Sequence, residues 1–217
     1  MKAYKDPNGD VFLFRVEKNF ERINKSATRL AMPEVTKEMF VDGLKALVDV
    51  DRGWIPDGEG MSLYIRPLIF ATEEALMARV SQKYMFAIVA TPAKAYYSKP
   101  IAVKISDFYS RAANGGVGSA KAAGNYAASF YPTRLAQEEG YDQIIWTDDG
   151  THTKFEESGT MNVFVRINDT MYTPATSEKI LDGVTRDSFI NLAKSKGIEV
   201  VIGDIFVKDV IEAHKNG

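Results

Sequence analysis

The sequence predicts an α+β protein with two lobes. Short apolar segments that are typical of strands are mixed with longer segments whose apolar residues recur every three or four positions, as in helices. The stretch 92–100 begins and ends with proline and follows neither period, which predicts a linker between the lobes. We therefore expect a first lobe over residues 1–91 and a second lobe over residues 101–217.

The first lobe is expected to begin with a strand over 11–16, after the turn-forming residues 6–9 (Asp-Pro-Asn-Gly). A helix should follow this strand and end before Pro33, because proline cannot continue a helix. Its apolar positions are Phe20, Ile23, Ala27 and Leu30. The remaining elements expected in this lobe are a helix over 37–49 and strands over 61–70 and 84–91.

The second lobe is expected to contain a glycine-rich run between its first strand and its first helix. Asn168 and Asp169 predict the turn of a hairpin, and Gly197 is a favourable end for a helix. In order, the predicted elements are a strand over 101–106, a helix over 122–138, a strand over 142–147, hairpin strands over 161–167 and 171–173, a helix over 186–196, a strand over 198–202 and a short final helix.

The composition excludes several classes of site. The 217 residues are 45% hydrophobic and 26% charged, with a net charge of -2, so no basic field favours nucleic acid. The absence of cysteine excludes disulfides, thiolate metal sites and a cysteine nucleophile. His152 and His214 lie far apart in the sequence, so we expect no metal centre. No apolar run is long enough for a membrane helix, and the first residues do not form a secretory signal. A cytoplasmic location is expected.

Lys121 lies in a run of small residues, Gly-Gly-Val-Gly-Ser-Ala-Lys-Ala-Ala-Gly-Asn-Tyr over 115–126. A phosphate-binding loop of the Gly-Lys-Ser/Thr type is excluded, because Ala122 follows the lysine and supplies no magnesium ligand. A lysine among glycines and alanines can approach a flat cofactor closely, and lysine forms Schiff bases with carbonyl compounds. The residues alone leave a solvated loop lysine open as the alternative.

Glu157 begins a second unusual run, Glu-Ser-Gly-Thr-Met-Asn over 157–162. A fixed carboxylate is what a pyridoxal phosphate ring requires at its pyridine nitrogen. The alternative is a surface glutamate in an acidic loop, since Glu156 is its neighbour. The residues alone do not decide between these two interpretations.

The two runs together resemble the branched-chain amino acid aminotransferases, which are fold-type IV pyridoxal phosphate enzymes. Three further blocks carry the same resemblance, namely Met-Lys-Ala-Tyr over 1–4, Met-Ser-Leu-Tyr-Ile-Arg-Pro over 61–67 and Leu-Asp-Gly-Val-Thr-Arg over 181–186. The resemblance covers nearly the whole chain. It implies a smaller N-terminal lobe and a larger C-terminal lobe that binds the cofactor.

The resemblance also implies roles for particular residues. Lys121 is expected to bind pyridoxal 5'-phosphate covalently and to move a proton between the substrate carbon and the cofactor. The expected cofactor-binding residues are Arg22, Lys121, Tyr126, Glu157, Thr160, Leu181, Val184 and Thr185. Tyr64 and Arg66 are expected to accept the carboxylate of glutamate or 2-oxoglutarate. Arg15 competes with Arg22 for the role of phosphate ligand.

The implied function is transamination of leucine, isoleucine or valine with 2-oxoglutarate by a homodimer. Compared with the family, the chain is expected to lack a segment at each end. Two alternatives therefore stay open beside the branched-chain activity. One is another fold-type IV enzyme, such as a D-amino acid aminotransferase or an aminodeoxychorismate lyase. The other is an inactive fragment.

Overall fold

The structure is a computed structural model that describes residues 1–95, 97 and 99–216. The chain divides into two compact units, Met1–Lys99 and Pro100–Gly217. Tyr96 and Ser98, which belong to the expected linker, lie outside the described residues. Within the described ranges, no helix has both the length and the apolar character needed to cross a bilayer.

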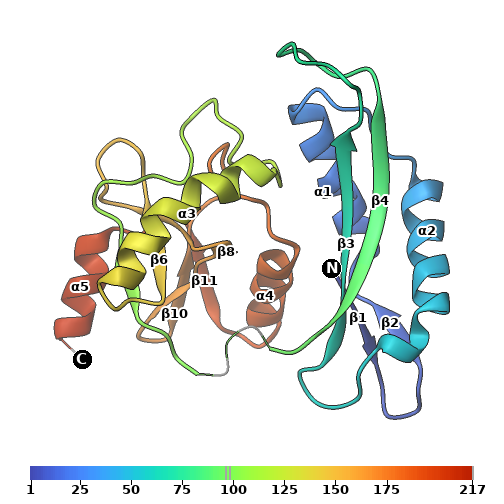
Figure 1. Cartoon of the computed structure of the whole chain (residues 1–217). Coiled ribbons are helices and arrows are strands. Elements are labelled where there is room, and N and C mark those ends of the chain that lie inside the picture. Colours follow the sequence, from blue (N-terminus) through green and yellow to red (C-terminus); the bar gives the residue numbers. More distant parts are fainter. Residues whose placement is uncertain (96, 98, 217) are drawn as a thin grey trace. The chain divides into compact units, whose positions relative to one another are not determined.

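The first unit is a four-stranded sheet with two helices on one face (Figure 1). The strands lie in the order β2-β1-β3-β4, and all neighbouring strands are antiparallel. The strands are β1 (Lys2–Lys5), β2 (Val11–Leu13), β3 (Ser62–Ala71) and β4 (Tyr84–Ala93). The helices are α1 (Val16–Arg29) and α2 (Lys37–Val50), followed by the short 3-10 helix η1 (Arg52–Trp54).

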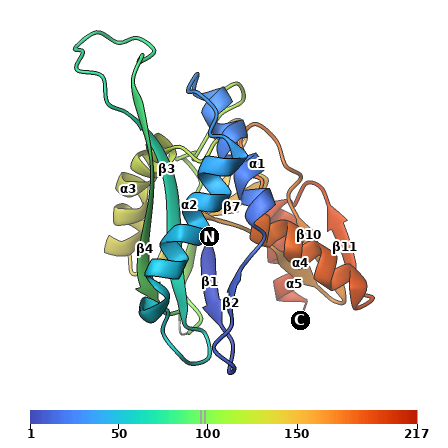
Figure 2. The same cartoon turned by 90° about the vertical axis from the view of Figure 1, so that its right-hand side faces the viewer.

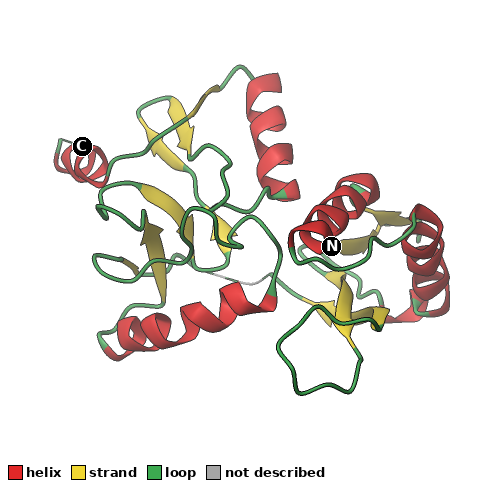
Figure 3. Ribbon diagram, turned by 90° about the horizontal axis from the view of Figure 1, so that it is seen from above, coloured by secondary structure: helices red, strands yellow, loops and turns green. Residues whose placement is uncertain are grey.

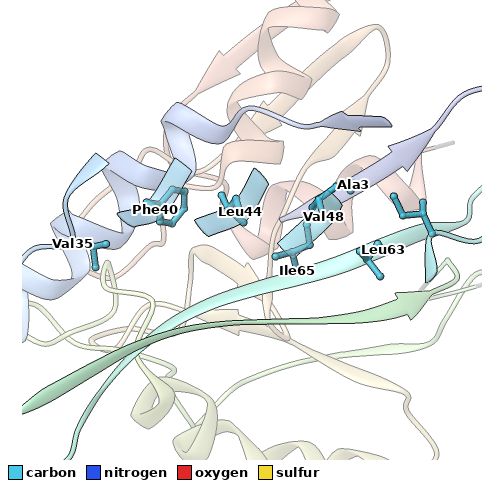
Figure 4. Packing of buried hydrophobic residues seen from close by; sticks show 8 residues of the cluster. Ala3, Val35, Phe40, Leu44, Val48, Leu63 and Ile65 are labelled. Atoms are coloured by element: carbon cyan, nitrogen blue, oxygen red, sulfur yellow. The ribbon is translucent and has the colours of Figure 1, made fainter. Parts of the chain in front are cut away.

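The core of the first unit forms where α2 packs on β3. Phe40, Leu44 and Val48 recur every four residues, so they lie on one face of α2 and are buried there. Leu63 and Ile65 alternate along β3 and meet this face, as Figure 4 shows. The opposite pleat of β3 therefore remains outside this core and carries the polar residues discussed below.

The first unit differs from the predicted elements at three points. Strand β1 was not predicted, because four residues with two lysines carry little periodicity. The strand expected over 11–16 ends at Leu13, since Arg15 adopts a left-handed conformation with φ 51° and caps α1. Pro92 and Ala93, expected in the linker, belong to β4, where Pro92 pairs with Leu63. Proline is tolerated there because β4 is an edge strand.

The second unit contains two small sheets and three helices. One sheet has the order β5-β6-β7-β8 and the other the order β11-β10-β9. The strands are β5 (Val103–Ile105), β6 (Gln143–Thr147), β7 (Phe155–Ser158), β8 (Met161–Asn162), β9 (Val165–Ile167), β10 (Thr170–Thr173) and β11 (Glu199–Ile202). The helices are α3 (Ala123–Glu138), α4 (Val184–Ser195) and α5 (Val207–Lys215).

The second unit contains two pairs of parallel strands, and the strands of each pair are connected through a helix. Strands β5 and β6 are parallel and are joined through α3, while β10 and β11 are parallel and are joined through α4. Figure 2 shows α4 beside β10 and β11, and Figure 3 shows the long loops that separate strands from helices. Both connections carry predicted site residues, because Lys121 precedes α3 and Leu181 precedes α4. Strand-to-helix connections of parallel pairs are common places for ligand sites.

Three predictions for the second unit need correction. Strand β7 was not predicted, because its four residues include two glutamates. The strand expected over 161–167 is split into β8 and β9, and only β9 pairs with β10 in the predicted hairpin. The helix expected from residue 186 starts at Val184, since Gly183 acts as its N-cap. The predicted hairpin turn is confirmed, with Asn168 in a left-handed conformation at φ 53°.

Candidate active site

Five of the predicted site residues lie around one recess of the second unit. Tyr126, Glu157, Thr160 and Leu181 line the recess. Lys121 belongs with them, because it follows the lining residue Ala120 and donates a hydrogen bond to Tyr126. They come from the loop before α3, from α3, from β7 and the turn after it, and from the loop before α4.

Lys121 lies near the end of a glycine-rich connection, residues 115–122, which we call the lysine loop. Its Nζ donates to the hydroxyl oxygen of Tyr126 at 2.7 Å. The loop is held by Asn125, whose buried amide donates to the carbonyl oxygens of Val117 at 2.8 Å and Ala120 at 2.9 Å. Asn125 therefore fixes the backbone on the N-terminal side of the lysine, and Tyr126 contacts its amine.

Gly118 is needed for the lysine loop to pack on residues 178–181, which we call the 178–181 segment. A Cβ atom at Gly118 would lie 2.7 Å from the carbonyl oxygen of Lys179 and 2.5 Å from the Cβ of Ala112. The backbone of the two segments also makes direct contact, because the N–H of Ser119 donates to the carbonyl oxygen of Glu178 at 2.8 Å. A side chain at Gly118 would force these segments apart.

We predict that Gly118→Ala destabilises the protein by about 1–3 kcal/mol, the usual cost of overpacking a dense site. Gly124→Ala is the matched control in the same region. Gly124 lies in α3, and a Cβ atom there meets nothing within 4 Å, so this change should stabilise the helix by about 0.5–1 kcal/mol. Chemical denaturation of both variants measures the difference. Equal stability of the two variants would contradict this account of the loop.

Glu157 lies on β7 with its carboxylate buried. Its Oε1 accepts hydrogen bonds from the N–H of Leu181 at 2.8 Å and from the amide of Asn162 at 3.3 Å. Its Oε2 lies 3.0 Å from Nε of Arg111. Burial raises the pKa of the Glu157 carboxyl to about 7, and the Arg111 guanidinium and the Leu181 N–H oppose this rise. The interactions with Arg111 and Leu181 therefore offset only part of the cost of burying the charged carboxylate.

Glu156 and Glu157 are adjacent, but they have different partners. Successive side chains of a strand point to opposite faces. Glu156 forms an ion pair with Lys179, with 2.5 Å between Oε1 and Nζ, and Lys179 also reaches Asp149 at 2.8 Å. Burial raises the pKa of the Glu156 carboxyl, and the Lys179 ammonium opposes this rise. Glu157, and not Glu156, lines the recess.

Leu181 and the start of α4 are tied to Glu157 by Asn162. The amide of Asn162 donates to the carbonyl oxygen of Leu181 at 2.8 Å as well as to Glu157. Gly183 packs against Asn162 so closely that an added Cβ would collide with its Oδ1. Val184 and Thr185, expected before the helix, form its first two positions. The first turn of a helix presents N–H groups that its own carbonyls do not accept, which suits an anion.

The other three predicted residues belong to the first unit. Tyr64 and Arg66 lie on the same face of β3, as their spacing predicts, and Nη2 of Arg66 donates to the Tyr64 hydroxyl at 3.3 Å. Arg22 lies on α1, where its Nη2 donates to Oδ1 of Asn19 at 3.3 Å. Its competitor Arg15 precedes α1 as the N-cap residue.

Three residues of the site were not predicted, namely Arg111, Asn125 and Asn162. Each acts through partners that are distant in sequence or through backbone atoms, neither of which leaves a periodic signal. Asn125 was part of the quoted glycine-rich run, so its polarity among small residues was an available but weak signal. Arg111 carried no signal, because nothing in the sequence connects it with Glu157.

Comparison with protein families decides the affiliation of the chain. The family model described as Amino-transferase class IV matches residues 1–215. The chain belongs to the class IV aminotransferases. This membership confirms the predicted family and the α+β fold of fold-type IV.

The chain is similar to branched-chain-amino-acid aminotransferases over its full length. It is 47% identical to a probable branched-chain-amino-acid aminotransferase of Staphylococcus epidermidis and 43% identical to branched-chain-amino-acid aminotransferase 2 of Bacillus subtilis. Both comparisons cover 100% of the chain, which spans 62% and 61% of the lengths of these relatives.

Solved structures of branched-chain aminotransferases have a similar fold. The branched-chain aminotransferase of Thermoproteus uzoniensis with norvaline matches with a TM-score of 0.80 at 26% identity, over 96% of this chain and 68% of that one. The branched-chain amino acid aminotransferase of Escherichia coli matches with a TM-score of 0.78 at 26% identity, over 96% of this chain and 67% of that one.

Proposed function

We propose that the protein is a pyridoxal phosphate-dependent aminotransferase that transfers the amino group of leucine, isoleucine or valine to 2-oxoglutarate. The observation that carries the proposal is the grouping of Lys121, Tyr126 and Glu157 around one recess. Two of these groups have the chemistry that the cofactor requires, since lysine forms Schiff bases and a carboxylate pairs with a protonated pyridine nitrogen. The names of the relatives support the substrate class.

The chemistry of Glu157 fits the proposed cofactor. The buried carboxyl has a pKa raised to about 7, so Arg111 and the two hydrogen-bond donors do not fully offset its burial. A cationic N–H group beside the carboxylate would favour its ionised form. A protonated pyridine nitrogen is such a group. Glu157 is therefore the residue that we propose for this position.

The remaining residues are assigned by their chemistry and by the family resemblance. Lys121 would hold the cofactor through Nζ, and the Tyr126 hydroxyl would bind its ring oxygen. Thr160 and Leu181, which line the recess, would lie beside the ring. The first-turn N–H groups at Val184 and Thr185 would bind the phosphate, and the resemblance implies the same role for Arg22. When bound, pyridoxal phosphate supplies the carbonyl that captures an amino group and the ring that accepts an electron pair from the α-carbon.

Lys121 has a second task in the proposed reaction. The Lys121 Nζ is the basic group that would take up the proton from the substrate α-carbon and later give it back. The Tyr126 hydroxyl, which contacts Nζ at 2.7 Å, holds this amine close to the recess. Tyr64 and Arg66 are proposed to receive the carboxylate of glutamate or 2-oxoglutarate, since guanidinium groups bind carboxylates in a bidentate manner.

A substrate comparison tests this proposal. The protein is incubated with pyridoxal phosphate, 2-oxoglutarate and either L-leucine or D-alanine, and glutamate formation is measured. We expect L-leucine to be the better amino donor by at least about tenfold, a difference of about 1.4 kcal/mol in the activation free energy. Faster reaction with D-alanine would instead favour a D-amino acid aminotransferase. Absence of product from either donor would favour an inactive chain.

We further propose a cytoplasmic homodimer. A composition without cysteine suits a reducing compartment, and the implied family commonly forms dimers. Light scattering of the purified protein measures the assembly directly. A monomer with full aminotransferase activity would contradict the dimer.

A further inference from the structure

Arg111 is buried where three segments of the second unit meet. It lies in the connection between β5 and α3, and its Nε is 3.0 Å from Oε2 of Glu157 on β7. Its Nη2 donates to the carbonyl oxygen of Gly118 at 3.0 Å and to the carbonyl oxygen of Lys179. The side chains of Arg111 and Glu157 are 7% and 4% exposed. The guanidinium therefore contacts the lysine loop, the 178–181 segment and the buried carboxylate.

We infer that Arg111 is a positioning residue of the cofactor site, which fixes Glu157 relative to the lysine loop and favours the ionised form of its carboxylate. The inference rests on the proposed function, because Glu157 is the group through which Arg111 acts. Arg111 and Glu157 both line the recess.

The geometry requires arginine and not merely a positive charge. A guanidinium is planar and presents several N–H groups in fixed directions, so it can contact a carboxylate and two carbonyl oxygens simultaneously. A lysine ammonium is a single point at the end of a flexible chain. Arg111→Lys thus keeps the charge beside Glu157 but is expected to lose part of the link to Gly118 and Lys179.

The charges around Glu157 determine what the loss of Arg111 does. Arg111 and Lys121, both from the connection before α3, favour the ionised carboxylate, whereas burial and the neighbouring Glu156 on β7 oppose it. The N–H of Leu181 and the amide of Asn162 are neutral donors to the same carboxylate. Without Arg111, Glu157 would hold its proton more tightly, and less of it would be ionised and able to pair with a protonated ring nitrogen.

The role of Arg111 is tested by measuring the proton affinity of Glu157 in the protein without cofactor. It is measured by ¹³C NMR titration of labelled glutamate side chains, with the Glu157 signal assigned from its absence in Glu157→Gln. We expect Arg111→Met to raise this affinity at least about tenfold and Arg111→Lys to raise it less. Arg134→Met is the matched control, since Arg134 is an exposed arginine that faces Glu138 on α3 and should leave the affinity unchanged. An affinity in Arg111→Met within twofold of wild type would overturn the inference.

A double variant keeps the inference testable if Arg111→Met does not fold. Removing one partner of a buried pair leaves an uncompensated charge, so the additional change Glu157→Gln should restore folding if Arg111 acts through Glu157. A double variant as unfolded as Arg111→Met would overturn the inference and assign Arg111 to the packing of the two loops alone. All of these measurements are made on the protein without cofactor. Failure of wild type to bind pyridoxal phosphate would therefore contradict the proposed function without deciding the role of Arg111.

Discussion

Replacing Lys121 with alanine is expected to lower the aminotransferase rate by at least about 10³-fold, within the range that a positioned acid–base group contributes. The variant lacks the amine that we propose to attach the cofactor and to move the proton at the substrate carbon. Tyr126, the hydrogen-bond partner of Lys121, cannot replace it, because its hydroxyl forms no Schiff base. The rate of glutamate formation from leucine and 2-oxoglutarate measures the effect.

Lys154→Ala serves as the control for this prediction. Lys154 also belongs to the second unit, but it pairs with Asp204 at 2.6 Å and does not line the recess. Its replacement should leave the rate within about twofold of wild type, because ion pairs near the surface contribute little to stability. A similar loss of activity in both variants would show that the rate reports general damage to the unit and not the chemistry of Lys121.

Glu157→Gln is expected to lower the same rate by about 10²–10³-fold, because a neutral amide does not stabilise the proton on a pyridine nitrogen. The variant should also change how stability depends on pH in the protein without cofactor. The Glu157 carboxyl has a pKa of about 7 in the folded protein, above its ordinary value of 4.5. The folded state therefore binds the proton more tightly than the unfolded state.

The sign of the pH effect follows from this difference. Glu157 contributes stability that is fully present below pH 4.5 and is lost as the pH rises through about 7. One unit of pKa difference corresponds to about 1.36 kcal/mol, so the free energy of unfolding falls by up to about 3 kcal/mol over this range. We predict that Glu157→Gln removes this decline, whereas Glu138→Gln, an exposed change on α3, retains it. Denaturant titrations at a series of pH values between about 4 and 8 measure how the free energy of unfolding of each variant changes with pH. Identical slopes in wild type and Glu157→Gln would contradict the assignment.

The sequence was most informative where structure depends on nearby residues. Helix α2 was predicted from the spacing of its apolar residues, and that spacing forms the face that packs on β3. The same holds for Tyr64 and Arg66, whose spacing places both on one face of β3. The run around Lys121 identified the lysine loop because glycine and alanine are needed where backbones approach closely, as Gly118 shows.

The sequence was least informative where a residue depends on distant partners. Strand β7 contains two adjacent glutamates, which in a sequence favour a surface loop. Both are buried because Lys179 compensates Glu156 and Arg111 compensates Glu157. These partners are distant in the chain, so no local pattern predicts them. The family spacing selected Glu157 over Glu156, and Glu157 is the one of the two that lines the recess, whereas its ion pair with Arg111 could be found only in the structure.

The most direct test of the central claim is to find which lysine binds the cofactor. The protein is incubated with pyridoxal phosphate, reduced with borohydride, digested and mapped by mass spectrometry. Our account predicts the mass of one reduced cofactor on the peptide that contains Lys121, and its absence in Lys121→Ala. A cofactor fixed on another lysine, or on none, would contradict the assignment of this recess as the active site.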